Sequence, residues 1–491
     1  MSLAELYRPG LGLVNDFYQL TMAYGYWKSG IAEREAVFHL TFRRCPFGGG
    51  YTVAAGLGVA LELIEGFCFE RQDLDYLGRL TGDSGELLFE SGFLDYLAEM
   101  RMTCDVDAVP EGTVVFPQAP VLRVRGPLAQ AQLLETPLLN VLSFQSLIAT
   151  KAARVCQAAE GDSVLEFGLR RAQGIDGGLS ASRAAYIGGC HATSNALAGR
   201  MLGLPVRGTH AHSWVLAFEE EQQAFDTYAE VMPDNVTLLV DTYDTEGGLR
   251  RAIEAGRRMR ARGKELTAIR LDSGDLVALS RRARRELDKA GFPETSIVAS
   301  GDLDELRIRD LKQKGASIDI WGVGTRLVTG HPDASLASAY KLGAIRAEGG
   351  EWQFRGKESD EIEKATLPGV LRVRRFVREN GQVFADGIVN ELGAAGESLR
   401  DFEWPFADMT VYAEEALSSS WLSETVMKDG DRVGKQPGLS DIRERVRVQL
   451  DRLPPGLRDL EPSARFPVGI EHGLFRLQDS SRRGPPAKAS S

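Results

Sequence analysis

The sequence lacks the features that mark membrane, secreted and zinc-stabilised proteins. It has no run of about 18 uninterrupted apolar residues and no basic N-terminal segment followed by an apolar core, so it predicts neither a membrane span nor a secretory signal. Its five cysteines show no CxxC or Cys/His spacing, which argues against a disulfide framework and a structural zinc site. We therefore expect a cytoplasmic protein with free thiols.

Basic residues are too few and too dispersed for a nucleic-acid-binding surface. Asp and Glu outnumber Lys and Arg by 69 to 58, which gives a net charge of −11, and no Lys/Arg block with interleaved aromatics occurs. The sequence therefore predicts no nucleic-acid partner. A polyphosphate ligand would have to be held by local Arg or Lys side chains, backbone N–H groups and a divalent cation.

What the sequence does contain is a unit repeated four times between residues 236 and 325. Each apolar run stops at a small polar cluster, and three of the runs are followed by an amphipathic stretch such as 275–291. This βαβα order predicts a parallel sheet with its functional residues at the carboxyl ends of the strands. Segments 164–170 and 204–213 add two similar units, so we expect an irregular α/β barrel. The polar residues at the predicted strand ends are Asp241, Arg270, Asp272, Asp275, Asp302 and Thr325.

The rest of the chain predicts two flanking regions around this α/β core. Residues 1–140 mix helices with short strands, which indicates an N-terminal α+β domain, and the barrel is expected at 141–340. The stretch 341–410 is β-rich, and such returning strands often complete an earlier sheet, here that of the N-terminal domain. Residues 411–491 form a C-terminal extension whose tail, from 480, is small, polar and Pro-containing, which predicts disorder.

Two of the six histidines, His210 and His212, lie at the end of the predicted strand in GTHAHSW (208–214). Histidines in such a position most often hydrogen-bond the backbone of a turn, but an imidazole at a strand's carboxyl end can also act as a nucleophile or general base. The two rings would point to opposite faces if the strand continued through them, which argues against a shared metal ion.

The segment AIRLDSGD (268–275) places Arg270 beside Asp272 and Asp275 where a strand meets a helix. These residues could form an ion pair and a helix cap. Alternatively, Arg270 recognises an anion while an aspartate binds sugar hydroxyls or magnesium-bound water. The next two units end in SGD (300–302) and GVGT (322–325), where small residues let backbone N–H groups approach a phosphate.

Two other segments permit two interpretations each. The run FGLRRAQGIDGG (167–178) is either a basic turn into a helix or an anion-binding loop. The aromatics of NDFYQLTMAYGYW (15–27) have helical spacing, and such aromatics belong more often to a core than to a ligand site.

Taken together, these segments resemble nicotinate phosphoribosyltransferases, the enzymes that start NAD synthesis from nicotinic acid. The resemblance covers roughly residues 10 to 370 and includes RGKESDEIEKATLPG (355–369). It implies a type II phosphoribosyltransferase fold and a homodimer with shared active sites. The motifs that carry it, in the family's order, are NDFYQLTMAYGYW, FRRCPFGGGYTVAAGL, LLETPLLN, GLRRAQGIDGG, GTHAHSW, LLVDTYDT, AIRLDSGDL, SGDL and WGVGTRLVTG.

The resemblance also implies a reaction and its residues. The pyridine nitrogen of nicotinate would attack C1′ of 5-phosphoribosyl 1-pyrophosphate, with Mg²⁺ as cofactor and ATP as co-substrate. His212 would be phosphorylated by ATP, and Asp272 and Asp302 would lie near the ribose. Nicotinate would contact Tyr18 of the neighbouring subunit, Phe167, Arg170, Thr209 and Arg270. Ser300, Gly301, Gly322, Gly324 and Thr325 would bind the phosphoribosyl donor. The metal ligands stay unassigned.

The sequence also bears on the choice between acid and amide substrates. Nicotinamide-using relatives carry an aspartate that accepts the amide N–H, whereas the comparable stretch 190–199 has Ser194 and Asn195 and no acid. A carboxylate there would repel nicotinate, so its absence favours the acid. His210 departs from the family, which often has an apolar residue there, and the sequence leaves open whether His210 tunes the site or packs.

Three alternatives remain at this point. The first is a nicotinamide phosphoribosyltransferase of the same fold, and the second is a catalytically silent metabolite-binding regulator. A quinolinate-type decarboxylating enzyme fits less well, because its acid-binding site needs more cationic residues and its chain is typically much shorter.

Overall fold

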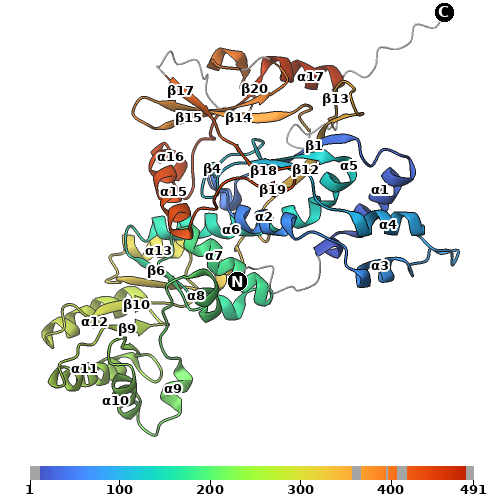
Figure 1. The fold of residues 1–491 in the computed structure, drawn as a ribbon. Coiled ribbons are helices and arrows are strands. Elements are labelled where there is room, and N and C mark those ends of the chain that lie inside the picture. Colours follow the sequence, from blue (N-terminus) through green and yellow to red (C-terminus); the bar gives the residue numbers. More distant parts are fainter. Residues whose placement is uncertain (1–10, 357–365, 394–395, 406–416, 483–491) are drawn as a thin grey trace, which may run out of the picture. The chain divides into compact units, whose positions relative to one another are not determined.

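The computed structural model describes residues 11–356, 366–393, 396–405 and 417–482. Its contacts divide the chain into two units, one made of residues 1–147 and 335–491 and the other of residues 148–334 (Figure 1). The boundary between Leu147 and Ile148 falls within the long helix α6, Glu135–Ala158. No helix in the described ranges has both the length and the apolar character that a membrane crossing requires.

A seven-stranded sheet forms the centre of the first unit, in the order β13-β12-β1-β5-β3-β18-β19. Strands from late in the chain pair with early ones: β12 lies antiparallel to β1, and β18 lies antiparallel to β3. The prediction that later strands complete the N-terminal sheet is therefore confirmed. The strands are β1 Glu35–Phe42, β3 Asp105–Ala108, β5 Pro120–Pro127, β12 Ser338–Arg346, β13 Gln353–Phe354, β18 Glu424–Lys428 and β19 Asp431–Arg432.

Helices pack against this sheet through one hydrophobic core. Helix α1 contacts α4 through aromatic side chains, with Tyr24 5.2 Å and Trp27 5.9 Å from the ring of the fully buried Phe93. His39 on β1 is also buried, and its Nε2 accepts a hydrogen bond from the Leu371 N–H at 3.0 Å. The helices are α1 Phe17–Lys28, α2 Leu57–Glu65, α3 Arg71–Leu77, α4 Ser91–Glu99 and α5 Leu128–Leu133, and a small ladder joins β2 Thr52–Val53 to β4 Val114–Val115.

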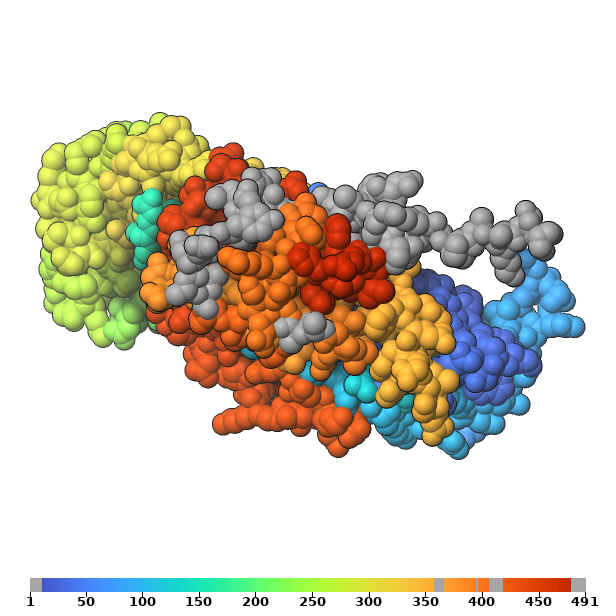
Figure 2. Space-filling view, turned by 90° about the horizontal axis from the view of Figure 1, so that it is seen from above, coloured from blue at the N-terminus to red at the C-terminus, as the bar shows by residue number. Residues whose placement is uncertain are grey.

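Part of the expected completion of the sheet is wrong, because β14 and β15 belong to a separate five-stranded sheet. The two strands form a local hairpin, and a buried bidentate pair holds them together, with Arg375 donating to Asp386 at 2.8 and 2.7 Å. Figure 2 shows these orange segments and the blue N-terminal residues on the surface of the same unit. The strands are β14 Leu371–Arg378, β15 Val383–Asn390, β16 Phe402–Glu403, β17 Leu417–Trp421 and β20 Val468–Glu471.

The C-terminal helices are α15 Leu439–Asp451, α16 Pro455–Arg458 and α17 His472–Arg482. Two segments named from the sequence reach beyond the described residues. These are 483–491, in the tail predicted to be disordered, and 357–365, in the late lysine-containing motif.

The second unit contains the predicted parallel sheet. Its six strands run in the order β7-β6-β11-β10-β9-β8, every neighbouring pair is parallel, and the sheet curls as an open half-barrel. The α/β fold class is therefore confirmed. The strands are β6 Ser163–Glu166, β7 Ala192–Thr193, β8 Thr237–Leu239, β9 Ala268–Leu271, β10 Ser296–Ala299 and β11 Ile320–Val323.

Helices connect these strands, as the βαβα order requires. Figure 1 shows α10, α11 and α12 grouped beside β9 and β10. Asp275 caps α12 by accepting hydrogen bonds from the N–H groups of Val277 and Ala278, so the capping interpretation of this aspartate is correct. The helices are α7 Gly174–Ile187, α8 Ala196–Leu202, α9 His212–Leu216, α10 Glu221–Val231, α11 Thr245–Ala261, α12 Leu276–Lys289, α13 Glu305–Gln313 and α14 Thr325–Val328.

The strand predicted over 204–213 is wrong. This segment makes a single parallel bridge, between Val206 and Thr193, and the sixth strand of the sheet is the short β7. Pro205 has no N–H for a ladder, and His212 is already the first residue of α9. The histidines therefore lie in a loop and at a helix start, not in a strand.

Candidate active site

The side chain of Arg270 joins three chain segments at the carboxyl end of the parallel sheet. Its Nη1 donates to Thr209 Oγ1 at 2.9 Å, Nη2 donates to Asp272 Oδ1 at 2.7 Å, and Nε donates to Ser300 Oγ at 2.7 Å. Its guanidinium carbon also lies 5.8 Å from the centre of the Phe167 ring. Four of the residues assigned to the site from the sequence are thus in contact with Arg270.

The carboxylate of Asp272 is held in its charged form. Burial alone would raise its pKa, but hydrogen bonds from Ser300 and Arg270, together with the Arg270 charge, hold the pKa below its ordinary value. Asp272 therefore carries a negative charge at neutral pH. The cation beside it is Arg270, which without this partner would be free to bind an anion.

Asp241 fixes the backbone that follows Asp272. Its Oδ2 accepts the Asp272 N–H at 2.9 Å and the Ser273 hydroxyl at 2.8 Å. Its Oδ1 is buried and has no hydrogen-bond partner among the described residues. One carboxylate oxygen thus remains for a ligand, a water or a cation.

At two glycines of this rim, a neighbouring backbone or ring atom lies so close that no side chain would fit. Gly301 has φ +96°, and a Cβ there would lie 2.3 Å from the carbonyl oxygen of Asp272. The next residue, Asp302, also has a positive φ of +46°, and its side chain is exposed. A Cβ at Gly322 would lie 2.8 Å from the Phe167 ring. The Phe167 ring therefore occupies the space that Gly322 leaves.

The two histidines have different environments. His210 is 6% exposed, its Nε2 accepts the Leu239 N–H at 3.2 Å, and its ring packs edge-on against Tyr228 at 4.9 Å. Burial lowers the pKa of His210 to about 4, so the ring is neutral at pH 7. His210 is thus an anchor that holds the loop to β8.

His212 is only partly buried, and its Nδ1 lies 3.2 Å from the Thr242 hydroxyl. When Nδ1 donates its proton to Thr242, Nε2 carries the lone pair, so His212 retains a nucleophilic nitrogen. His210 is thus packed in the interior, whereas the His212 ring is partly accessible.

Sequence reasoning missed Glu166, which lies 1% exposed at the end of β6. Its carboxylate accepts hydrogen bonds from the Gly168 N–H, from the Ser182 hydroxyl at 2.9 Å and from the Thr193 hydroxyl at 2.5 Å. Glu166 therefore fixes the turn that presents Phe167. The signal available in the sequence was an acidic residue inside the apolar run VLEFG, which requires buried hydrogen-bond partners.

The remaining assigned residues lie at or beyond the edge of this cluster. Arg170 is exposed on the short 3₁₀ helix Leu169–Arg171, and Thr325 is exposed at the start of α14 after Gly324. Tyr18 lies in the other unit, on α1, and is 49% exposed. Its hydroxyl lies 3.4 Å from Glu135 Oε1. The alternative that Tyr18 is a core aromatic is therefore wrong.

A cavity of about 290 Å³ opens beside the Arg270 cluster, inside the curled sheet. Two of the residues that line it, Phe167 and Thr209, also contact Arg270. A small planar ring is of a size that such a cavity can hold. The other polar residues that line it are Ser163, His191, Arg207, Asn235, Thr237 and Thr267.

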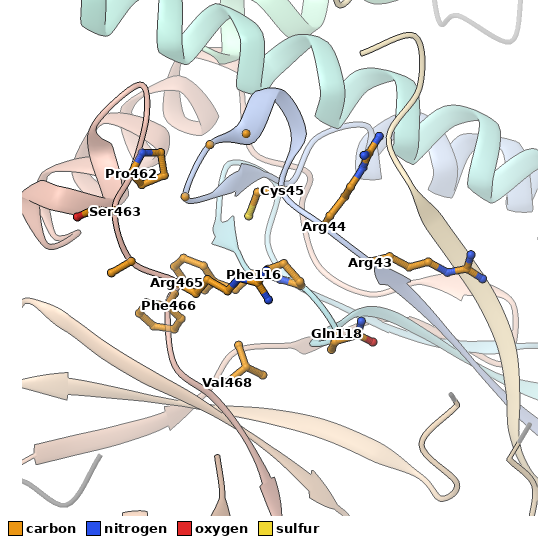
Figure 3. A pocket seen from close by; sticks show the side chains of 15 residues that line it. Arg43, Arg44, Cys45, Phe116, Gln118, Pro462, Ser463, Arg465, Phe466 and Val468 are labelled. Carbon is orange, nitrogen blue, oxygen red and sulfur yellow. The ribbon is translucent and has the colours of Figure 1, made fainter. Parts of the chain in front are cut away.

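A larger cavity, of about 400 Å³, lies in the first unit and has a different lining. Arg43, Arg44 and Arg465 contribute to it, and none of the described residues that line it is acidic. Figure 3 shows the guanidinium groups of Arg43 and Arg44 extending away from the middle of this cavity. Because it contains none of the hydrogen-bonded polar groups that Arg270 brings together, the rim of the parallel sheet is the better candidate active site.

Comparisons with known proteins identify the family of the chain. Models of the nicotinate phosphoribosyltransferase (NAPRTase) N-terminal domain, family and C-terminal domain match residues 13–143, 163–388 and 372–478. The nicotinate phosphoribosyltransferase of Bacillus subtilis is 40% identical over 470 residues, which cover 95% of this chain and 94% of that protein. The chain therefore belongs to the nicotinate phosphoribosyltransferase family.

Two further relatives cover the chain equally well. Nicotinate phosphoribosyltransferase pncB2 of Mycobacterium tuberculosis is 41% identical over 479 residues, which cover 97% of this chain and 95% of that protein. The crystal structure of human nicotinic acid phosphoribosyltransferase superposes with a TM-score of 0.81 at 30% identity, covering 95% of this chain and all of that one.

The environment of His210 yields a prediction about stability and pH. His210→Leu leaves the buried Leu239 N–H without an acceptor, so we expect it to lower the free energy of unfolding at pH 7 by about 1–3 kcal/mol. The unfolded chain binds a proton near pH 6.5, whereas folded His210 resists protonation until about pH 4. Acidification through this window therefore destabilises the wild type through His210, and the difference from the variant should shrink as pH falls.

Urea unfolding at pH 7.0, 6.0 and 5.0 measures this difference. His212→Ala is the matched control, because it removes a partly exposed ring two residues away and should shift stability at pH 7 by less than about 0.5 kcal/mol. A constant difference between wild type and His210→Leu across the three pH values would contradict the assignment of His210 as a buried neutral anchor.

Proposed function

We propose that the chain catalyses the transfer of a phosphoribosyl group from 5-phosphoribosyl 1-pyrophosphate to nicotinate, forming nicotinate mononucleotide and pyrophosphate. This reaction is the first step of NAD synthesis from nicotinate. The observation that carries the proposal is the Arg270 cluster, in which one guanidinium contacts Thr209, Asp272 and Ser300 and faces the Phe167 ring. The names of the relatives support the same reaction.

The chemistry requires control of charge at the sugar. The nicotinate ring nitrogen forms a bond to C1′ while the bond from C1′ to pyrophosphate breaks, and pyrophosphate leaves with the bonding electrons. Positive charge develops on the ribose, so the carboxylates of Asp272 and Asp302 would stabilise it. The lowered pKa of Asp272 supports this role, because its carboxylate stays ionised at neutral pH.

Nicotinate would bind with its ring on Phe167 and its carboxylate directed toward cationic and hydroxyl groups. Three of the five N–H groups of Arg270 are used within the protein, so two are left for a substrate. Thr209 and the exposed Arg170 would supply further donors. These assignments follow the family resemblance, and the contacts around Arg270 support them.

Two observations favour the acid over the amide. The stretch 190–199, comparable with the one that carries the amide-selecting aspartate, has no acid, and its Asn195 caps α8 by accepting the N–H groups of Leu197 and Ala198. The nearby buried carboxylate of Glu166 already accepts three hydrogen bonds. It follows Leu165 and precedes Phe167, so the alternation of a strand directs it to the opposite face from the Phe167 ring.

The phosphate groups of the donor would be bound by the two loops at the ends of β10 and β11. Ser300 and Gly301 on one loop, and Gly322, Gly324 and Thr325 on the other, would direct backbone N–H and hydroxyl groups at the 5′-phosphate. The positive φ of Gly301 supports this role, because it turns the backbone sharply beside Asp272.

Mg²⁺ fits the residues at this rim. The described residues contain no group of three or more His, Cys, Asp or Glu side chains placed to hold a metal. However, Mg²⁺ at phosphate sites needs only one or two carboxylates besides substrate oxygens and water. Asp241, with its unpartnered Oδ1, and Asp302 would hold it. The ion would neutralise charge on the pyrophosphate.

ATP would act through His212. Nε2 of His212 would take the γ-phosphoryl group of ATP, releasing ADP, and water would later remove it as phosphate. Coupling this hydrolysis to the transfer would drive an otherwise less favourable reaction. The contact of Nδ1 with Thr242 supports the assignment of Nε2 as the nucleophile.

A second copy of the chain would complete each site. Tyr18 would stack on nicotinate from the neighbouring subunit of a homodimer. The exposed apolar side chains beside it support a protein contact at this surface, because Val14, Phe17 and Met22 are 48, 48 and 40% exposed.

The substrate choice is tested by release of pyrophosphate. We expect turnover with nicotinate and 5-phosphoribosyl 1-pyrophosphate, stimulation by ATP, and little turnover when nicotinamide replaces nicotinate. Comparable rates with the two pyridines would favour the nicotinamide-using alternative. A folded protein that turns over neither pyridine would favour the silent regulator.

The role of ATP is tested at His212. His212→Ala should lose ATP hydrolysis and ATP stimulation but retain a weak ATP-independent transfer, because the sugar chemistry does not use this ring. Acid-labile phosphate from labelled ATP should appear on the wild type and on the matched variant His210→Leu. Equal labelling of His212→Ala would refute the assignment.

The shared site is tested by mixing two defective proteins. Tyr18→Ala and Asp302→Ala each damage every site of their own homodimer, whereas a mixed dimer contains one site with both residues intact. Activity should therefore return on mixing under conditions where subunits exchange. Because ring stacking adds only about 1 kcal/mol beyond area burial, Tyr18→Ala should be assayed at low nicotinate. An active protein that sediments as a monomer would contradict the shared site.

A further inference from the structure

A chain of charged contacts lies just behind the two proposed phosphate loops. Asp304 is two residues beyond Asp302, Arg326 immediately follows Thr325, and Asp304 Oδ2 lies 2.5 Å from Arg326 Nη1. The Asp304 side chain is 8% exposed. One ion pair thus connects the segment after β10 with the segment after β11.

The same carboxylate also begins a helix. Asp304 Oδ1 accepts the Arg307 N–H at 2.8 Å, so Asp304 is the N-cap of α13. Its two oxygens therefore have separate tasks, since one sets the start of α13 and the other holds Arg326 at the start of α14. A change at Asp304 can remove one task and keep the other.

Glu305, the next residue, anchors this helix start to α6. Its carboxylate is 3% exposed, pairs with Lys151, and accepts a hydrogen bond from Arg154 Nε at 3.1 Å. Lys151 and Arg154 are 1 and 3% exposed. Buried ion pairs add little net stability but penalise any displacement of either partner, so this cluster fixes position more than it stabilises.

We propose that Arg326, through its ion pair with Asp304, is a positioning residue that sets the spacing of the loops 300–302 and 322–325 for a single phosphate-bearing substrate. The pair itself does not touch the substrate. The inference rests on the proposed function for the identity of that substrate, 5-phosphoribosyl 1-pyrophosphate. The linkage between the two loops is inferred from the ion pair alone and does not depend on the proposed function.

The kinetic test uses variants that separate the two tasks of Asp304. Asp304→Asn keeps an oxygen for the Arg307 N–H but loses the charge, and Arg326→Gln removes the other partner. Each should raise the KM for 5-phosphoribosyl 1-pyrophosphate about tenfold and leave the KM for nicotinate within about twofold. The double variant should be no worse than either single one, and Arg326→Lys should recover part of the loss.

The matched control is Arg307→Gln. Arg307 lies on the same helix and pairs with Asp310 at 3.0 Å, but both side chains are well exposed, so its loss should change neither KM. If Asp304→Asn left the KM for the donor unchanged while Arg326→Gln raised it, Arg326 would contact the phosphate itself and the positioning role would be wrong. Equal increases in both KM values would overturn it as well.

Hydrogen exchange on the full chain without substrates tests the linkage independently of activity. Amides of both loops, 300–303 and 322–328, should exchange faster in Asp304→Asn and in Arg326→Gln than in the wild type or Arg307→Gln. Unchanged exchange in both loops would overturn the inference even if the wild type turns over nicotinate. If the wild type turns over no pyridine but Asp304→Asn and Arg326→Gln still exchange faster than the wild type, the proposed substrate is refuted and the linkage stands.

Discussion

The guanidinium of Arg270 is the contact on which the candidate site depends. Strands β9 and β10 pair in register, with Arg270 opposite Val298 and Leu271 opposite Ala299, so Asp272 and Ser300 emerge side by side. Arg270 then connects both of them to Thr209, which reaches the rim from a loop. Without this cation, the Asp272 carboxylate would keep its burial but lose its charged partner, and its charged form would be less favourable.

Under the proposed function, this arrangement would let an acidic protein bind a polyanion. The net charge of −11 repels phosphates at long range, so binding must depend on fixed local groups. At the rim these would be the two remaining N–H groups of Arg270 and the backbone N–H groups at 300–302 and 322–325. Salt screens the long-range repulsion more than these close contacts, so the site does not require a basic protein.

The parts of the fold that could be predicted from the sequence are those with a local, repeated signal. The four units between 236 and 325 each contain a buried strand, and all four strands form as expected. Three of these strands are followed by a helix whose N-cap is an aspartate. Segment 204–213 looked similar, but Pro205 and Gly208 leave it with a single bridge. A composition pattern identifies an apolar run, whereas only the tertiary structure determines whether a neighbouring strand edge is free to pair with it.

Long-range contacts account for most of what sequence reasoning missed. Glu166 takes its partners from Gly168, Ser182 and Thr193, and no spacing rule indicates that these groups converge. For β14 and β15, sequence reasoning expected a long-range contact where a local one forms. The two strands pair with each other in a hairpin, because a short loop costs less entropy to close than a distant pairing.

Under the proposed function, the histidine pair places a structural residue and a nucleophile two positions apart. His210 binds the end of β8, and this anchor places His212 at the start of α9, against Thr242. Thr242 adjoins Asp241, whose carboxylate holds the backbone of Asp272 and the hydroxyl of Ser273. A phosphoryl group on His212 would therefore lie one residue from the side chain that orients the ribose-binding turn. Under the proposed function, phosphorylation of His212 would therefore influence the position of Asp272 through this short path of covalent and hydrogen bonds.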